Sequence, residues 1–205
     1  MREKTGKWLF ILLFIAGLII SGINPHDYFT WGLEVFPVVI VFIILIITHS
    51  TFRLTGLLYS LILIHSFILF IGGHYTYAEV PFFDWLKDIF QLQRNNYDKV
   101  GHFAQGFIPA IAIREVLIRK QVITNAKWQF FIIVCICLSI SAAYEFLEWF
   151  VAEATGDSAE AFLGTQGYVW DTQSDMLYAT IGSIISLTIL NRIHDHQLKR
   201  IKIFY

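Results

Sequence analysis

Long apolar stretches recur along this sequence, and each is near the length that a helix needs to cross a lipid bilayer. The hydrocarbon core of a bilayer requires about 20 predominantly apolar residues in helical form. Stretches of this kind occupy residues 8–23, 31–48, 54–71, 100–118, 128–151 and 175–190. Only 15% of the residues are charged, whereas soluble domains contain roughly 25%. The sequence therefore predicts an all-α, polytopic transmembrane helix bundle with six spans in a single domain, 1–205.

The lysine and arginine residues are unevenly divided between the two sides that six spans would define. With the N-terminus in the cytoplasm, eleven of them fall in inner segments, and only Lys87, Arg94 and Lys99 fall in outer segments. Cytoplasmic segments of membrane proteins carry an excess of basic residues. The distribution therefore predicts that both termini lie in the cytoplasm (N-in/C-in).

The outer segment between the third and fourth spans contains the sequence PFFDWLKDIFQL, which alternates aromatic and charged residues. This spacing predicts a short amphipathic helix over about 82–92, lying in the membrane interface with its aromatic face toward lipid. The alternative is a lid that packs on the protein.

Ionisable residues at or near the outer ends of the fourth, fifth and sixth predicted spans occur as three pairs. The pairs are Asp98 with His102, Glu145 with Glu148, and Asp171 with Asp175. Spacings of three and four place both members on one helix face. An ionisable group inside a bilayer costs about 2.5–3.5 kcal/mol on insertion scales, so it needs a compensating role. We therefore expect the three pairs to converge on one site at the outer surface.

Carboxylates and imidazoles from facing helices form the metal sites of many helix bundles. Such a donor set suits a divalent metal ion such as magnesium, manganese, zinc or iron. The expected metal ligands are His102, Glu145, Glu148, Asp171 and Asp175. The expected catalytic groups are His102, Asp98 and Glu148, with Asp98 tuning the imidazole. The expected substrate-binding residues are Gln105, Gln166, Trp170 and Gln173, and Gly156, Gly164 and Gly167 are expected to form turns.

Each of these residues also has a structural interpretation. Asp98 and Asp171 can be N-caps of their helices. Glu145 and Glu148 can pair with His102 or share a proton, and the small residues near Asp175, which are Ala179, Gly182 and Ser183, are typical of close helix packing. These alternatives stay open at the level of sequence.

Three segments, YDKVGHFAQGFIPAIAIRE, YEFLEWFVA and FLGTQGYVWDTQSDM, closely resemble the YjdF-like bacterial inner-membrane proteins. The resemblance runs through nearly the whole chain. It implies a multi-pass protein of the bacterial inner membrane and implies no reaction. A fainter likeness is to VanZ-like membrane proteins, which are linked to glycopeptide resistance and pair a DKxxH segment, here 98–102, with later acidic helices. The acidic partners would be Glu148 and Asp175.

Three classes of function remain compatible with the sequence. The first is a metal-dependent membrane enzyme that acts on a lipid or envelope precursor at the outer face. The second is a proton- or cation-coupled transporter in which Glu145 and Glu148 are alternately protonated. The third is a structural or assembly protein whose polar groups fix the helix register. No basic face suggests a nucleic-acid partner, and the expected partner is the lipid bilayer.

Overall fold

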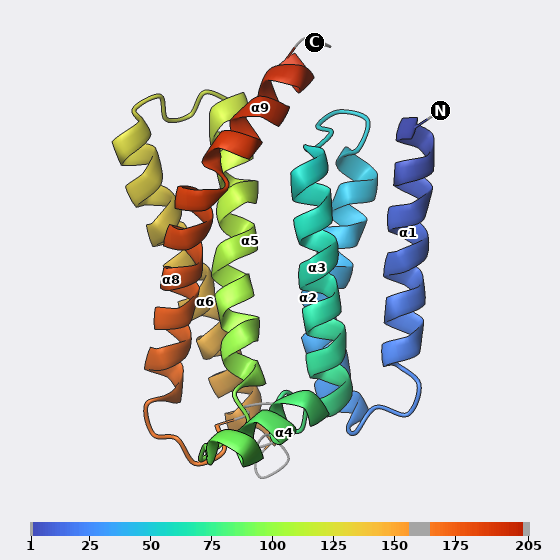
Figure 1. Cartoon of the computed structure of the whole chain (residues 1–205), viewed down its shortest axis with the longest axis vertical. Coiled ribbons are helices and arrows are strands. Elements are labelled where there is room, and N and C mark those ends of the chain that lie inside the picture. Colours follow the sequence, from blue (N-terminus) through green and yellow to red (C-terminus); the bar gives the residue numbers. More distant parts are fainter. Residues whose placement is uncertain (1, 156–164, 203–205) are drawn as a thin grey trace.

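The computed structural model describes residues 2–155 and 165–202, and these residues form helices joined by short connections. The helices are α1 (Arg2–Ser21), α2 (Tyr28–Thr48), α3 (Gly56–Tyr75), α4 (Pro81–Phe90), α5 (Tyr97–Arg119), α6 (Ala126–Thr155), α8 (Asp171–Ile189) and α9 (Asn191–Lys202). The six longest, α1, α2, α3, α5, α6 and α8, run along the long axis of the molecule in alternating directions (Figure 1). The first and last described residues lie at one end of this bundle, and α4 lies across the other end.

Length and composition qualify several of these helices to cross a membrane. Helices α2, α3 and α6 are each long and apolar enough, and α8 qualifies together with α9, from which it is bent by 63°. The apolar part of α1, Gly6–Ser21, is shorter, and α5 carries charged residues at both ends. The all-helical prediction is therefore confirmed, with three or four candidate spans among the described helices.

Helices α5 and α8 pack backbone to backbone along most of their length (Figure 1). A Cβ atom added to Gly106 would lie 1.7 Å from the carbonyl oxygen of Ala179, and one added to Gly182 would lie 2.2 Å from the carbonyl oxygen of Phe103. Only glycine permits such an approach, because any larger side chain would overlap the facing backbone. The small residues therefore serve helix packing, and this packing fixes the start of α5 beside the start of α8.

Helix α4 forms where the sequence predicted a short amphipathic helix. Phe83 packs against a buried group of Tyr77, Val80 and Tyr97. The opposite side of the helix is exposed and carries Phe82, Trp85, Ile89 and Phe90. One face thus packs on the protein while an aromatic face points outward, so the helix combines features of the two alternatives. Its position relative to lipid stays a prediction.

A buried polar network joins α9 to the bundle at the end where the termini lie. Glu115 is fully buried and accepts hydrogen bonds from the main-chain N–H and the hydroxyl of Thr55, at 3.0 and 2.7 Å. The same carboxylate lies 2.9 Å from Nη1 of Arg119 and 3.1 Å from Nε2 of His194. These contacts offset the cost of burying the Glu115 carboxylate, and they hold α9 against α3 and α5.

The close approach of α5 and α8 gives a first test. We expect Gly106→Ala to lower the melting temperature in detergent, because overpacking a close contact costs about 1–3 kcal/mol. Gly32→Ala in α2 is the matched control, since a Cβ there meets no atom within 4 Å. Alanine favours a helix over glycine, so the control should retain or raise the melting temperature. Equal melting temperatures for the two variants would contradict the packing described here.

Candidate functional site: a charged cluster between α5, α6 and α8

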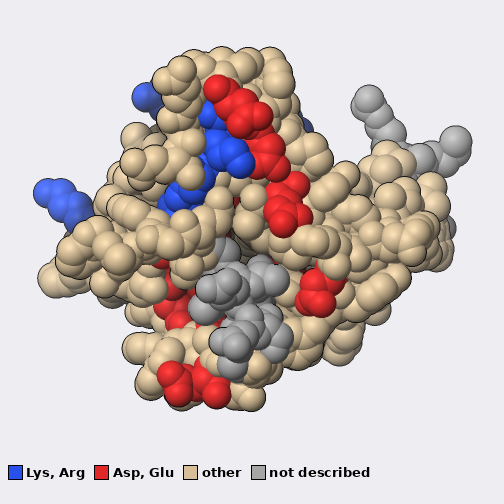
Figure 2. Space-filling model, turned by 90° about the horizontal axis from the view of Figure 1, so that it is seen from below, with Lys and Arg blue, Asp and Glu red and all other residues tan. Residues whose placement is uncertain are grey.

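The three predicted pairs meet at the end of the bundle that carries α4, together with two basic residues. We call this group the charged cluster. It comprises Arg94, Asp98, Lys99, His102, Glu145, Glu148, Asp171 and Asp175. In each of these residues the side chain or the residue as a whole is no more than about a tenth exposed. Seen from this end, the molecule shows both acidic and basic side chains on its surface (Figure 2).

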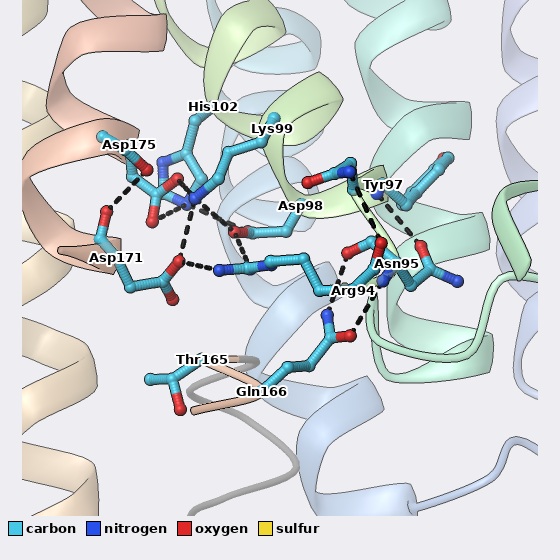
Figure 3. A network of polar contacts seen from close by, with 12 residues as sticks. Arg94, Asn95, Tyr97, Asp98, Lys99, His102, Thr165, Gln166, Asp171 and Asp175 are labelled. Carbon is cyan, nitrogen blue, oxygen red and sulfur yellow. Dashed lines mark hydrogen bonds and ion pairs between the residues drawn. The ribbon is translucent and has the colours of Figure 1, made fainter. Parts of the chain in front are cut away.

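Lys99 lies at the centre of the aspartates (Figure 3). Its Nζ atom is 2.9 Å from Oδ1 of Asp171, 2.5 Å from Oδ1 of Asp175 and 3.4 Å from Oδ2 of Asp98. Asp171 and Asp175 both reach it because a spacing of four places them on one face of α8. Lys99 therefore links α5 to α8 through a buried ion-pair network.

Arg94 approaches the same aspartates from the connection that precedes α5. Its Nη1 atom is 2.5 Å from Oδ1 of Asp171, and its Nη2 atom is 3.4 Å from Oδ2 of Asp98. Gln166 fastens this connection: its side chain accepts a hydrogen bond from the N–H of Asn95 and donates one to the carbonyl of Asn95, both at 2.9 Å (Figure 3). Gln166 thus orders the connection that carries Arg94.

His102 faces carboxylates through both ring nitrogens. Nε2 lies 3.2 Å from Oδ1 of Asp98 and 3.9 Å from Oδ2 of Asp175. Nδ1 lies 3.3 Å from Oε1 of Gln105 and 3.9 Å from Oε1 of Glu145. That Glu145 oxygen is buried and has no hydrogen-bond partner within residues 2–155 and 165–202. An oxygen that has lost water without gaining a donor is costly, so it marks a position where a proton or a cation would be stabilised.

The charges of the cluster do not balance. The described residues supply five carboxylates, from Asp98, Asp171, Asp175, Glu145 and Glu148, against the two permanent cations of Arg94 and Lys99. Carboxylates crowded in a buried site repel one another, so they are neutralised by protons or by bound cations. The cluster therefore has the capacity for additional positive charge.

A cavity of about 380 Å³ adjoins the cluster between α2, α3, α5 and α6. His102 and Glu148 line its polar end together with Glu34, which accepts a hydrogen bond of 3.2 Å from the hydroxyl of Tyr144. The rest of the lining is mostly apolar. Val41 of α2 and Ile140 of α6 both line the cavity and are 37% and 39% exposed, so it reaches the outer surface of the bundle between these helices.

The remaining predicted site residues lie outside this arrangement. Trp170 is largely exposed just before α8, and Gln173 is exposed within its first turn. Gly167 has the positive φ of 80° expected for a turn, whereas Gly156 and Gly164 lie outside the described residues. Sequence reasoning did not place Arg94, Lys99, Glu34 or Tyr144 in the site. The sequence feature that could have indicated part of this site is Glu34, an acidic residue within an apolar stretch.

Removal of the central cation tests the ion-pair network. Breaking a buried ion pair by deleting one partner costs about 3–5 kcal/mol, so we expect Lys99→Met to lower the melting temperature strongly. Asp175→Asn in the same chain should restore part of the loss by removing one unpaired carboxylate. Lys87→Met is the control, because Lys87 pairs with Asp84 at the surface of α4 and should matter little. A Lys99→Met protein as stable as the control would show that the network is not formed.

Comparison with known proteins places these features in a family. A family model described as "Predicted membrane protein (DUF2238)" matches residues 6–196. The inner membrane protein YjdF of Escherichia coli (strain K12) is 48% identical over 183 residues, which cover 89% of this chain and 88% of that protein. No solved structure matches the chain.

Proposed function

This chain belongs to the DUF2238 family of membrane proteins, and we propose that it is a membrane-embedded enzyme whose charged cluster binds a divalent metal ion. Asp98, His102 and Asp175 would supply the metal ligands, whereas Glu145, which faces the other ring nitrogen of His102, lies outside this set. The substrate is an amphiphile, a lipid or an envelope precursor, whose apolar part occupies the cavity beside His102.

One observation carries this proposal: the ligand atoms of Asp98, His102 and Asp175 all lie within 4.8 Å of one another. In both aspartates one oxygen contacts Lys99 and the other oxygen turns toward Nε2 of His102. Lys99 therefore orients the carboxylates in the way that outer-shell groups orient metal ligands. The sequence predicted Asp171 as a metal ligand, but its carboxylate contacts Lys99 and Arg94. In this proposal Asp171 therefore supports the metal ligands and does not bind the metal itself.

The positive charge of a bound divalent ion would also offset the excess negative charge of the cluster. A metal ion polarises a carbonyl or phosphoryl group, or lowers the pKa of a bound water molecule. Glu148, which lines the cavity, is positioned to act as the general base.

The cavity supports an amphiphilic substrate. Its walls are apolar, and its polar end holds the groups that would perform the chemistry. Because it reaches the surface of the bundle between α2 and α6, a molecule dissolved in the membrane could enter from the side. Pockets of a few hundred Å³ that combine apolar walls with a few convergent polar groups are typical ligand sites.

We further propose six spans in the inner membrane, with both termini in the cytoplasm and the charged cluster on the extracytoplasmic side. In this topology α1 and α5 also cross the membrane, in addition to the helices whose hydropathy alone qualifies them as spans. The polar residues of α5 face α8 and α9, where they are compensated. The aromatic face of α4 would lie in the outer interface.

A transport function is less well supported. The charged cluster and the Glu115 network lie at opposite ends of α5, and a proton or cation would have to pass between them. The residues in between include Ile108, Ala110 and Ile111, which are buried in the apolar core. This apolar layer favours a reaction at one membrane surface over transport of a proton or cation across the membrane.

The metal proposal is tested by elemental analysis. We expect the full-length protein, purified without chelators, to hold a divalent metal, measured by inductively coupled plasma mass spectrometry. Asp98→Asn and Asp175→Asn each remove a ligand oxygen, so metal affinity should fall at least tenfold. Glu153→Gln is the matched control, since Glu153 is exposed on α6 outside the cluster. Metal-free wild type, or equal occupancy in all variants, would sink the metal site.

The topology is tested by thiol labelling of the full-length chain in cells. Cys135 is exposed and is first replaced by alanine, whereas Cys137 is buried. We expect the Lys87→Cys variant to react with a membrane-impermeant maleimide in intact cells. The Lys199→Cys variant should react only after the membrane is permeabilised. Labelling in the opposite pattern would reverse the proposed orientation.

A further inference from the structure

A basic groove lies at the other end of the bundle, remote from the charged cluster. It has a volume of about 850 Å³ and runs between α9 and the connection from α2 to α3. Arg53, Arg192, His196 and Arg200 line it, and no carboxylate occurs among its described lining residues. All four of these residues are exposed.

The spacing of the basic residues on α9 points to an anion. Arg192, His196 and Arg200 are each four residues apart, so they form one row along the helix. Arg192 and Arg200 thus present two guanidinium groups on one side of α9, with His196 between them. The row is held in place, because Gln197 accepts a hydrogen bond of 2.8 Å from the N–H of Leu57 and His194 is fixed by Glu115. An anion bound beside the row would be attracted by both guanidinium groups.

A second groove, mostly apolar, adjoins the basic one. It has a volume of about 640 Å³ and lies between α1, α2 and α3. Arg53 and Gly56 line both grooves. The apolar groove is lined along its length by side chains that include Leu9, Leu13, Phe42 and Ile46, and at its head by Lys7 and His49.

The head of the apolar groove is electropositive as well. Burial lowers the pKa of His49, and the positive charges of Lys7 and Arg53 lower it further. A long apolar slot that ends at basic side chains has the shape and polarity of a phospholipid. Basic pockets between membrane helices commonly bind anionic headgroups.

We propose that the two grooves together bind one anionic phospholipid, with its phosphate between Arg53, Arg192 and Arg200 and an acyl chain in the slot between α1, α2 and α3. This site goes beyond the proposed enzyme function and does not depend on it, because it lies at the opposite end of the bundle. The lipid would fasten α9 and α1 to the membrane surface on the side of the termini.

The test uses the purified full-length protein and native mass spectrometry with added lipids. We expect dioleoyl phosphatidylglycerol to bind at least tenfold more tightly than dioleoyl phosphatidylethanolamine, and to raise the melting temperature. Dihexanoyl phosphatidylglycerol and inorganic phosphate should bind at least tenfold more weakly, because they cannot fill the apolar groove. Equal binding of the two dioleoyl lipids, or equal protection by inorganic phosphate, would overturn the lipid site.

Paired substitutions locate the binding. Arg192→Gln with Arg200→Gln should weaken phosphatidylglycerol binding at least tenfold. Lys127→Gln with Lys199→Gln removes the same charge at the same end, outside both grooves, and should leave binding unchanged. Arg53→Gln is a second variant should the first fail to fold, since it removes one of the proposed phosphate contacts and leaves the sequence of α9 unchanged. Equal affinity in the groove variants and the control would overturn the proposal.

Discussion

The ammonium group of Lys99 and the aspartates around it form the interaction on which this structure depends. Asp98 shares helix α5 with Lys99, and Asp171 and Asp175 come from α8, so the lysine joins two helices that are distant in sequence. The contact is possible because Gly106 and Gly182 let the two backbones approach closely. The same lysine holds one oxygen of Asp98 and one of Asp175, which leaves the other oxygen of each to face His102. Packing, ion pairing and the candidate chemistry are therefore parts of one arrangement.

Hydrophobic patterning and helical spacing were sufficient to predict the six long helices, α4 and the convergence of the three ionisable pairs, whereas α9 was not predicted. Those inferences rest on local rules, since a spacing of three or four places two side chains on one face wherever a helix forms. The roles of Lys99 and Arg94 could not be predicted in this way. Each is a basic residue in a polar segment, and only the tertiary approach of α8, 72 residues later for Lys99, shows what it contacts. Gln166 is similar, because its partner is the backbone of Asn95.

The bundle contains two polar networks, the charged cluster and the Glu115 network, and an apolar layer lies between them. At one end Glu115 is satisfied by Thr55, Arg119 and His194, so its contacts are those of a structural group. At the other end, among the residues that the structure describes, the carboxylates outnumber the fixed cations and an oxygen of Glu145 lacks a hydrogen-bond partner. The Glu115 network, in which the polar groups are paired, serves stability. The charged cluster, in which carboxylates outnumber fixed cations, is therefore the better candidate for chemistry.

The separation of Lys99 from its partners also constrains how the chain is made. A ribosome produces α5 before α6 and α8, so Lys99 and Asp98 emerge well before Asp171 and Asp175. Until α8 arrives, Lys99 has only part of its counter-charge, and α8 alone would bring two unpaired carboxylates toward lipid. In the proposed six-span topology, the charged end of α5 therefore gains its full counter-charge only when the last long helix has been synthesised.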